Sequence, residues 1–412
     1  MTTRTACRGL VVAALSFSAS AQVQMRNPGG GGGAIRIFNT DMAVLEAQEA
    51  RKDLPCTVNP VKPFLGFDLK FHAGYEVLVP LRELSGAEDL LTMIFRVTPE
   101  NKKDEPVYFS QRINVPSIEP DAKGNAYLQG SFDLGEGKYH VDWLMRDRSE
   151  RVCSFYWESE AVLPPRDKTL AMSLGPGAAA ASEREPFKEE PPVERPAADA
   201  TVETPLNVKV LVNFAPQNSH AATLQPLDLN ALVSILRSIA REPKIAKFSI
   251  VAFNMQEQRI LYRQDEAGHI DFPALGDALS SLKLGTVDLK RLSQKRAETD
   301  FLTTLITQEM SSKEQPDALI FAGPKVMLAE SVPESTLREV EAEYPVFYMN
   351  YNFNPQANPW RDAIGNTVRH FKGQEFTISR PRDLWFAWTE IMSRIVKFKI
   401  GRRGSSTSSS SQ

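Results

Sequence analysis

The chain has 412 residues, which at about 150 residues per domain is enough for two or three domains. Apolar residues make up 42% of the chain and charged residues 24%, the usual balance in globular proteins that bury a core. The formal net charge of -3 argues against a dedicated nucleic-acid-binding protein, which would show a basic face.

The N-terminus has the three parts of a secretory signal peptide. Arg4 and Arg8 supply positive charge, an apolar run covers residues 10–17, and Ala19-Ser20-Ala21 precedes Gln22. A membrane anchor is the alternative, but crossing a bilayer takes about 20 apolar residues and this run has about eight. We therefore predict that residues 1–21 are removed near Ala21, leaving a secreted or periplasmic protein without a membrane span.

Cleavage would remove Cys7 and leave Cys56 and Cys153 as the cysteines of the mature chain. An oxidising compartment favours a disulfide between these two residues. Such a bond would close a loop of roughly a hundred residues and could stabilise the fold by up to about 4.7 kcal/mol. Two buried free thiols are the alternative.

Three segments have compositions that do not support a packed core. Residues 22–34 contain a run of glycines, residues 175–205 are rich in proline, alanine and glutamate, and residues 400–412 are mostly serine. We expect them to form a disordered leader, a stiff solvated linker and a disordered tail. Two folded domains, 35–174 and 206–399, lie between these segments.

The first domain is predicted to be an all-β sandwich. Seven short runs rich in β-branched and aromatic residues are separated by turn residues, a pattern typical of sandwiches. The predicted strands are Phe67–Phe71, Tyr75–Val79, Leu91–Val97, Val107–Val115, Ala126–Phe132, Lys138–Met145 and Ser154–Ala161.

The turn Asp133-Leu-Gly-Glu-Gly-Lys-Tyr139 resembles the tyrosine corner of immunoglobulin-like domains, in which the tyrosine hydroxyl bonds to the backbone of the turn. The resemblance implies an Ig-like sandwich. In antibody domains a cysteine follows two residues after this tyrosine, but Val141 stands there. A disulfide between Cys56 and Cys153 would therefore be placed differently from the antibody one.

The second domain alternates apolar strands with amphipathic helices, which indicates an α/β doubly wound parallel sheet with helices on both faces. Strands are predicted at 209–213, 248–253, 318–321, 346–349 and near 376, with 259–262 as the hairpin partner of the second. Helices are predicted from Asp228, at 272–282, 301–310 and near 335–343, and as a closing helix with Pro381 in its first turn and an apolar face over 384–395.

This second domain resembles a von Willebrand factor A domain, and the layout of the chain resembles exported relatives of such domains that place a β-sandwich first. The resemblance covers about half of the mature chain. It rests on the opening strand that ends at Asn213, the hairpin after the second strand, Thr299-Asp300 at the start of the long helix, the strand 318–324, and the segment 373–379 with its following helix.

In that family an Asp-x-Ser-x-Ser motif, a threonine and a second aspartate hold a magnesium-type cation, because hard cations prefer negatively charged oxygen ligands. The matching positions of the motif are Asn213, Ala215 and Gln217, and Ala322-Gly323 stands where the second aspartate would be. Thr299 remains, with Asp300 beside it. We therefore expect no metal and no cofactor; weak binding rescued by Asp300 is the alternative.

The resemblance still implies a binding edge, since ligands of doubly wound sheets meet the carboxyl ends of the strands. The loop from Asn350 to Trp360 mixes aromatic residues with asparagines, which suits contact with a peptide or a sugar. Alternatively, the asparagines form turns and the aromatic rings pack inward. The candidate residues of this edge are Asn213, Gln217, Asn218, Thr299, Asp300, Tyr351, Asn352 and Phe353.

The sequence contains no complete catalytic motif. The histidines at 72, 140, 220, 269 and 370 lack metal-ligand spacing, and no nucleophile elbow, Walker or dinucleotide-binding motif occurs in a strand-to-helix setting. A scattered Ser-His-Asp arrangement is recognised only by geometry. We predict a noncatalytic exported protein that binds a protein or glycan partner; a structural subunit of a cell-envelope assembly and a cryptic hydrolase are the alternatives.

Overall fold

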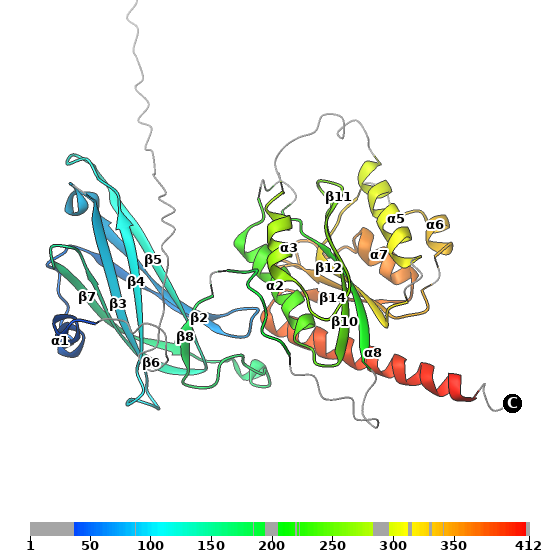
Figure 1. The fold of residues 1–412 in the computed structure, drawn as a ribbon, viewed down its shortest axis with the longest axis horizontal. Coiled ribbons are helices and arrows are strands. Elements are labelled where there is room, and N and C mark those ends of the chain that lie inside the picture. Colours follow the sequence, from blue (N-terminus) through cyan, green and yellow to red (C-terminus); the bar gives the residue numbers. More distant parts are fainter. Residues whose placement is uncertain are drawn as a thin grey trace, which may run out of the picture. The chain divides into compact units, whose positions relative to one another are not determined.

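The computed structural model describes residues 37–86, 88–183, 185–193, 205–218, 221, 223–282, 296–311, 315–328, 332–340 and 342–408. The chain divides into two compact units, Met1–Ser182 and Glu183–Gln412, which we call the first and second domains (Figure 1). The predicted signal peptide and the predicted leader lie outside the described residues.

The first domain contains two antiparallel sheets whose side chains share one hydrophobic core. Its strands are β1 Thr57–Leu65, β2 Phe71–Pro80, β3 Asp89–Pro99, β4 Val107–Val115, β5 Asn125–Leu134, β6 Gly137–Arg146, β7 Val152–Ala161 and β8 Ala179–Ala181. Its helices are α1 Asn39–Ala47 and the short 3-10 helices η1 Leu81–Leu84 and η2 Pro165–Asp167. The strand orders are β1-β2-β5-β8 and β4-β3-β6-β7.

Aromatic rings from both sheets form the centre of this core. The ring of Tyr75, on β2, meets the rings of Trp143 and Phe95 edge-on, with centroids 5.3 Å and 5.4 Å away. All three side chains are buried. Edge-to-face pairs contribute about 0.5–1.5 kcal/mol beyond the area they bury, so these contacts help to hold the sheets together.

Tyr139 makes the contact that its turn sequence predicts. Its buried hydroxyl lies 2.9 Å from the carbonyl oxygen of Gly135 and 3.0 Å from that of Ala178. Burial raises the pKa of Tyr139 to about 12, so the hydroxyl keeps its proton and acts as a donor. The side chain thereby ties the β5–β6 turn to the residue that precedes β8.

Cys56 and Cys153 form the predicted disulfide, with their Cα atoms 6.3 Å apart. Cys56 directly precedes β1, and Cys153 lies in β7. These strands belong to different sheets, so the bond joins the two layers of the first domain. The alternative of two free thiols is thereby excluded.

The first strand differs from the prediction. Residues 67–70, which were predicted to belong to a strand, form a turn. The first strand is instead β1, which contains Pro60 and Pro63. Proline cannot donate to a sheet and is tolerated on an edge strand, which is where β1 lies. The strand β8 was also not expected, because residues 179–181 fall within the predicted linker, yet they pair with β5.

The second domain is built on one mixed sheet with the strand order β11-β10-β9-β12-β13-β14. Its strands are β9 Leu206–Asn213, β10 Ile245–Asn254, β11 Arg259–Ala267, β12 Ala318–Pro324, β13 Val346–Tyr351 and β14 Gln374–Ile378. Neighbouring strands run parallel except for the hairpin pair β10 and β11. The carboxyl ends of β9, β12 and β13 therefore meet at one edge of the sheet.

Helices cover both faces of this sheet, with α2 and α8 on one and α5, α6 and α7 on the other (Figure 1). The helices are α2 Pro226–Ala240, α3 Phe272–Leu279, α5 Ala297–Met310, α6 Glu334–Arg338, α7 Ala363–His370 and α8 Pro381–Ser408. Two of them start at a side-chain cap: Asp271 accepts from the Ala274 N–H, and Asp362 accepts from the Gly365 N–H.

Two features of the second domain depart from the sequence expectations. Helix α7 lies in a stretch assigned to no element, because Gly365 and Asn366 weaken its helical pattern. Helix α8 continues to Ser408, into the tail that was expected to be disordered from residue 400. A helix that is already formed gains one hydrogen bond for each added residue, so it can extend into polar sequence.

Residues 185–193, which we call the docked segment, belong to the second domain although their composition predicts a solvated linker. The Phe187 ring lies 6.4 Å from the Phe214 ring, and a β carbon on Gly276 would come within 2.7 Å of the Phe187 β carbon. Glu190 accepts two hydrogen bonds from Arg241, at 2.7 Å and 3.0 Å. This half of the expected linker is therefore packed against the domain that follows it.

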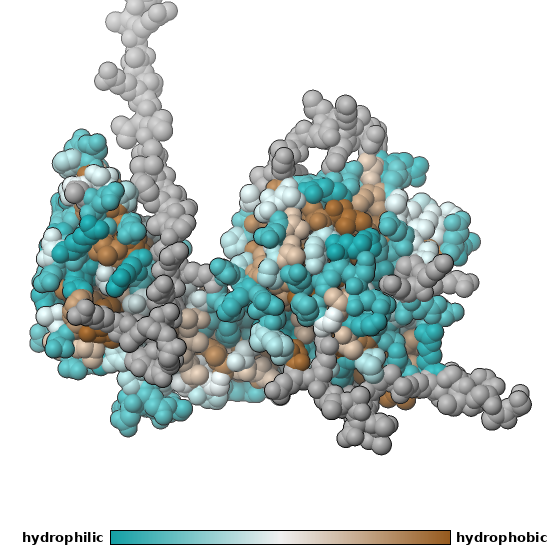
Figure 2. Space-filling model, viewed as in Figure 1, coloured by the Kyte–Doolittle hydropathy of each residue, from teal (hydrophilic) through white to brown (hydrophobic). Residues whose placement is uncertain are grey.

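The face of the molecule drawn in Figure 2 is mainly hydrophilic, with small hydrophobic patches. The exposed large apolar side chains include Phe64, Met327 and Trp360. Scattered residues of this kind are normal on protein surfaces and need a further reason before they indicate a site. None of the described helices combines the length and the apolar composition needed to cross a membrane.

Candidate functional site

The loops that follow β9, β12 and β13 lie at the carboxyl edge of the sheet. We call residues 214–218, 325–328 and 352–361 the strand-end loops. They contain half of the positions that the sequence singles out for binding, and hydrogen bonds join the loops to one another. Their geometry decides which of those residues can reach a partner.

Asn213, the last residue of β9, is fully buried and cannot touch a partner from the surface. Its Oδ1 accepts from the Met255 N–H at 3.2 Å, which fixes the orientation of the amide. Its Nδ2 has no hydrogen-bond partner among the described residues. Asn213 is therefore a structural residue of the sheet edge, contrary to its assignment to an exposed binding edge.

Gly323 lies beside Asn213 on β12 and explains one of the departures from the resemblance. Its φ is +153°, a backbone conformation that side chains rarely adopt. A β carbon on Gly323 would also lie 2.8 Å from the Asn213 β carbon. This position therefore requires glycine, and an aspartate there would clash.

Gln217 joins the first strand-end loop to the third. Its Nε2 donates to Asn352 Oδ1 at 3.1 Å, and its Oε1 accepts from the Phe353 N–H at 3.4 Å. Asn352 Oδ1 also accepts from the Asn354 N–H at 3.2 Å, which is a local turn contact. The structure thus brings Gln217, Asn352 and Phe353 together, but it uses the two amides inside the protein.

Tyr351 packs inward. Its side chain is fully buried, and its hydroxyl donates to the Ala215 carbonyl oxygen at 2.8 Å. Burial, reinforced by the negative charge of Asp228, raises the pKa of Tyr351 well above its usual value. The alternative interpretation of this loop, with inward aromatic rings and turn-forming asparagines, therefore holds for Tyr351 and Asn352.

Thr299 and Asp300 lie in the first turn of α5 and differ in exposure. Thr299 is buried, whereas Asp300 is exposed to solvent. Asn218 is also exposed, at the end of the first strand-end loop. Among the candidate residues that the sequence singled out, Asn218 and Asp300 are exposed, and Gln217 and Phe353 are half-buried.

The residues at the expected cation positions do not fit a hard divalent cation. The side-chain oxygen of Asn213 accepts from the Met255 N–H. The other polar atom of that side chain, Nδ2, is a donor and cannot ligate a cation. Ala215 offers a carbonyl that Tyr351 already uses, and both amide atoms of Gln217 are bonded within the protein. Magnesium-type ions need several available oxygen ligands, and these positions do not provide them.

Trp360 is an exposed large aromatic residue of the third strand-end loop, with 66% of its surface accessible. Lys325, in the second strand-end loop, donates to the carbonyl oxygens of Trp360 at 2.7 Å and of Asn358 at 3.1 Å. Met327, 54% exposed, lies in the same loop as Lys325. A large aromatic side chain is therefore held outward on a backbone that is fixed from a neighbouring loop.

A separate charged cluster lies in the first domain, where Asp68, His72 and Asp133 offer ligand atoms within 4.8 Å of one another. His72 Nδ1 lies 2.9 Å from Asp133 and Nε2 lies 3.0 Å from Asp68. Lys70 Nζ is 3.4 Å from Asp133 and 3.9 Å from Asp68. Burial disfavours the charged imidazole, but the bonds to both aspartates outweigh it and raise the pKa of His72 to about 10.

This cluster is balanced without a metal, because two cations face two carboxylates. It is also not a hydrolytic triad. Ser182 Oγ donates to Asp133 at 2.6 Å, and both nitrogens of His72 face carboxylates, so no nitrogen is left to accept the serine proton. The sequence could not indicate the cluster, since His72 meets Asp133 only through the pairing of β2 with β5.

Comparison with protein-family models finds no match to this chain, and comparison with curated proteins finds none. Among solved structures, a mutant of the minor pilin PilB from Streptococcus sanguinis is similar at 7% identity over 73% of this chain and 87% of that one, with a TM-score of 0.26. A β-glucuronidase from Bacteroides uniformis is similar at 9% identity over 74% of this chain and 39% of that one, with a TM-score of 0.18. Likenesses with scores this low carry no argument about function.

Proposed function

We propose that the chain is a noncatalytic exported binding protein that recognises a protein or glycan partner through the strand-end loops of its second domain. The observation that carries the proposal is the exposed indole of Trp360 on a backbone held by Lys325. Rigid aromatic side chains supply large contact areas at low entropic cost, which is why tryptophan is enriched at binding hot spots. Asn218, Phe353 and Met327 would form the surroundings of this anchor.

We further propose that the second domain is a von Willebrand factor A-like domain that has lost its metal-binding function, following an Ig-like sandwich. The hairpin of β10 and β11 at one side of an otherwise parallel sheet supports this proposal. So does the Tyr139 hydroxyl contact in the first domain. The engaged oxygens at the expected cation positions support loss of the metal.

Export is supported by two independent features. The order of charge, apolar run and small residues at the N-terminus is that of a secretory signal, and the Cys56–Cys153 disulfide suits an oxidising compartment. Binding outside the cytoplasm agrees with a chain that contains no complete catalytic motif.

The test uses the full mature chain against a glycan array and a phage-displayed peptide library. Selected ligands should lose affinity about thirtyfold with Trp360→Ala, because a hot-spot residue is worth about 2 kcal/mol or more. Phe386→Ala is the matched control, since Phe386 is an exposed aromatic residue on α8. Ligands that bind the Trp360 variant as tightly as the wild type would contradict the proposal and favour a structural subunit that holds its partners elsewhere.

A further inference from the structure

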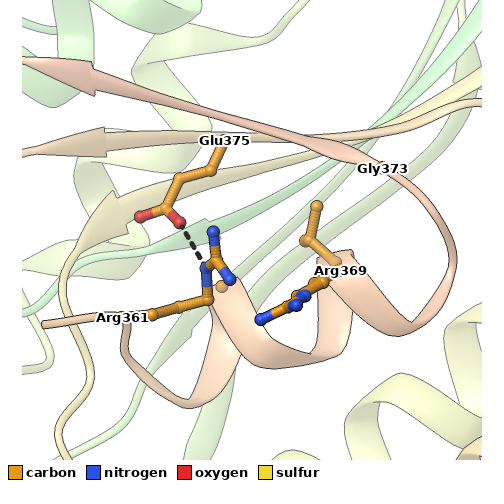
Figure 3. A pocket seen from close by; sticks show the side chains of 6 residues that line it. Arg361, Arg369, Gly373 and Glu375 are labelled. Atoms are coloured by element: carbon orange, nitrogen blue, oxygen red, sulfur yellow. Dashed lines mark hydrogen bonds and ion pairs between the residues drawn. The ribbon is translucent and has the colours of Figure 1, made fainter.

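A pocket of about 350 Å³ lies beside α7 in the second domain. One stripe of α7 and the start of β14 line it, and Figure 3 shows the polar side chains that face it. The lining residues are Arg361, Gly365, Val368, Arg369, Gly373 and Glu375. The pocket contains none of the residues that the sequence assigned to the binding edge.

The charges in the pocket do not cancel. Arg361 Nε lies 3.3 Å from Glu375 Oε2, and the other oxygen of Glu375 accepts from Asn350 Nδ2 at 2.8 Å. Glu375 is thus fully engaged and neutralises one arginine. Arg369 is exposed and has no carboxylate partner among the described residues, so the side chains that line the pocket carry one excess positive charge. The buried Asp362 carboxylate lies behind Gly365 and accepts from the N–H groups of Val326 and Gly365.

Arg361 lies just before α7 and Arg369 lies in the last turn of α7, and both side chains face the pocket (Figure 3). Like charges held close together repel, and an anion placed between them would relieve that repulsion. Guanidinium groups also present several N–H donors in a planar fork that matches the two oxygens of a carboxylate. Arg361 uses its Nε for Glu375, which leaves its terminal nitrogens for a ligand.

The glycines make room for this arrangement. A β carbon on Gly365 would lie 2.9 Å from Glu375 Oε2 and 2.8 Å from Arg361 Cγ, so a larger residue there would displace the pair. Val368 also lines the pocket, although only 1% of it is exposed. The accessible lining is therefore mainly polar and charged.

We propose that this pocket binds the carboxylate of a small monoanionic ligand, between the guanidinium groups of Arg361 and Arg369. One negative charge matches the excess of one positive charge, whereas the second charge of a phosphate would face Glu375. The carboxylate could belong to a free organic acid or to a sugar acid. This inference does not depend on Trp360 and would stand if the Trp360 side chain bound nothing, although Arg361 directly follows Trp360 in the third strand-end loop.

Titration of the full chain with butyrate, glucuronate and inorganic phosphate, followed by NMR, tests the proposal through the amide signals of Gly365, Val368 and Gly373. We expect saturable shifts with at least one of the two carboxylates. Phosphate should bind at least about tenfold more weakly than that carboxylate. Saturation by glucuronate alone identifies a sugar acid as the source, and saturation by butyrate as well identifies organic acids in general. Arg369→Gln should weaken carboxylate binding about tenfold, since a charge-assisted bidentate contact is lost.

The matched control is Arg394→Gln, because Arg394 is an exposed arginine on α8 outside the pocket. It should leave the affinity unchanged. Because Arg369 is exposed, its replacement should not affect folding, which the dispersion of the amide signals would verify. Equal binding by the Arg369 variant, phosphate binding as tight as carboxylate binding, or no saturable shift with either acid would each overturn the proposal.

Discussion

Lys209 and Glu309 form an ion pair inside the second domain, with Nζ of Lys209 2.9 Å from Oε2 of Glu309. The two residues are only 5% and 1% exposed. Lys209 lies in the central strand β9 and Glu309 in α5, so the pair connects the sheet to a helix on its face. Arg263, on the hairpin strand β11, also contacts Glu309.

Replacing Glu309 by glutamine should destabilise the second domain by about 3–5 kcal/mol, because it removes the carboxylate that faces the buried Lys209 ammonium. Urea unfolding followed by tryptophan fluorescence measures the effect, since Trp360, Trp385 and Trp388 lie in the second domain. The change should appear as a lower midpoint for that domain.

The double variant Lys209→Met with Glu309→Met is the control for this prediction. Removing both charges avoids the unpaired ion, so it should be more stable than the single Glu309 variant. Arg263 can still turn toward Asp265, which is 4.0 Å away. A single variant within about 1 kcal/mol of the wild type would show that the pair is not needed for stability.

His72 should remain protonated at neutral pH, because its pKa is raised to about 10 by Asp133 and Asp68. The raised pKa adds stability that is fully present below about pH 6.5, the pKa of an unfolded histidine, and is lost as the pH rises through 10. The melting temperature of the first domain should therefore fall over that interval. His72→Gln should flatten the profile.

The direct measurement is the imidazole signal of His72 in an NMR titration of the full chain. Asp133→Asn should lower the pKa of His72, since one of the two carboxylates is lost. A midpoint near 6.5 in the wild type would refute the assignment of a charged imidazole.

The docked segment should behave as part of the second domain. Phe187→Ala should destabilise that domain by about 1–2 kcal/mol, because it removes a half-buried ring that packs against the ring of Phe214. Glu190→Gln should cost about 1–3 kcal/mol, since Arg241 loses its bidentate partner. Arg237 Nε also lies 2.8 Å from Glu190, although without the alignment of a hydrogen bond.

Limited proteolysis checks the docking of this segment. Residues 185–193 should resist cleavage in the wild type and become sensitive in the Phe187 variant. The control is Glu189→Gln, because Glu189 is an exposed acidic residue next to Glu190. Rapid cleavage within the segment in the wild-type protein would restore the interpretation of a solvated linker.

Removing the disulfide should lower the stability of the first domain. Cys56 and Cys153 are 97 residues apart, and in the chain-entropy model a loop of that size contributes about 4–5 kcal/mol. The variant with serine at both positions should therefore melt earlier than the wild type. Adding dithiothreitol should lower the wild-type melting temperature and leave that of the variant unchanged; an equal response of both would contradict the prediction.

The sequence predicted those strands and helices whose own residues show the alternation of a strand or the three-and-four spacing of a helix. The alternation of Tyr139, Val141 and Trp143 indicated an inward strand face, and these residues are buried in β6. The spacing of Leu232, Leu236 and Ile239 indicated a helix, which α2 forms. Strand β1 escaped prediction because its prolines are tolerated only at a sheet edge, and strand position is not a local property.

The candidate site was harder to predict for a related reason. The sequence places Asn213, Gln217 and Tyr351 at the correct edge of the sheet. It does not reveal that Gln217 donates to Asn352 in the third strand-end loop or that Tyr351 donates to Ala215 in the first. Burial of Tyr351 depends on a partner, Ala215, that is 136 residues away. The pocket beside α7 gave no signal, since α7 itself was not predicted.

The disulfide also determines how the chain would respond to mechanical force. Tension applied to the two ends of the protein would pass from Cys56 to Cys153 through the sulfur–sulfur bond, because this covalent path is the shorter one. Strands β1 to β6 lie inside the closed loop and would bear no load while the bond is intact. Reduction would release this segment, whose roughly hundred residues span on the order of 300 Å when extended. The extensibility of the chain under load would therefore be set by the redox state of its surroundings.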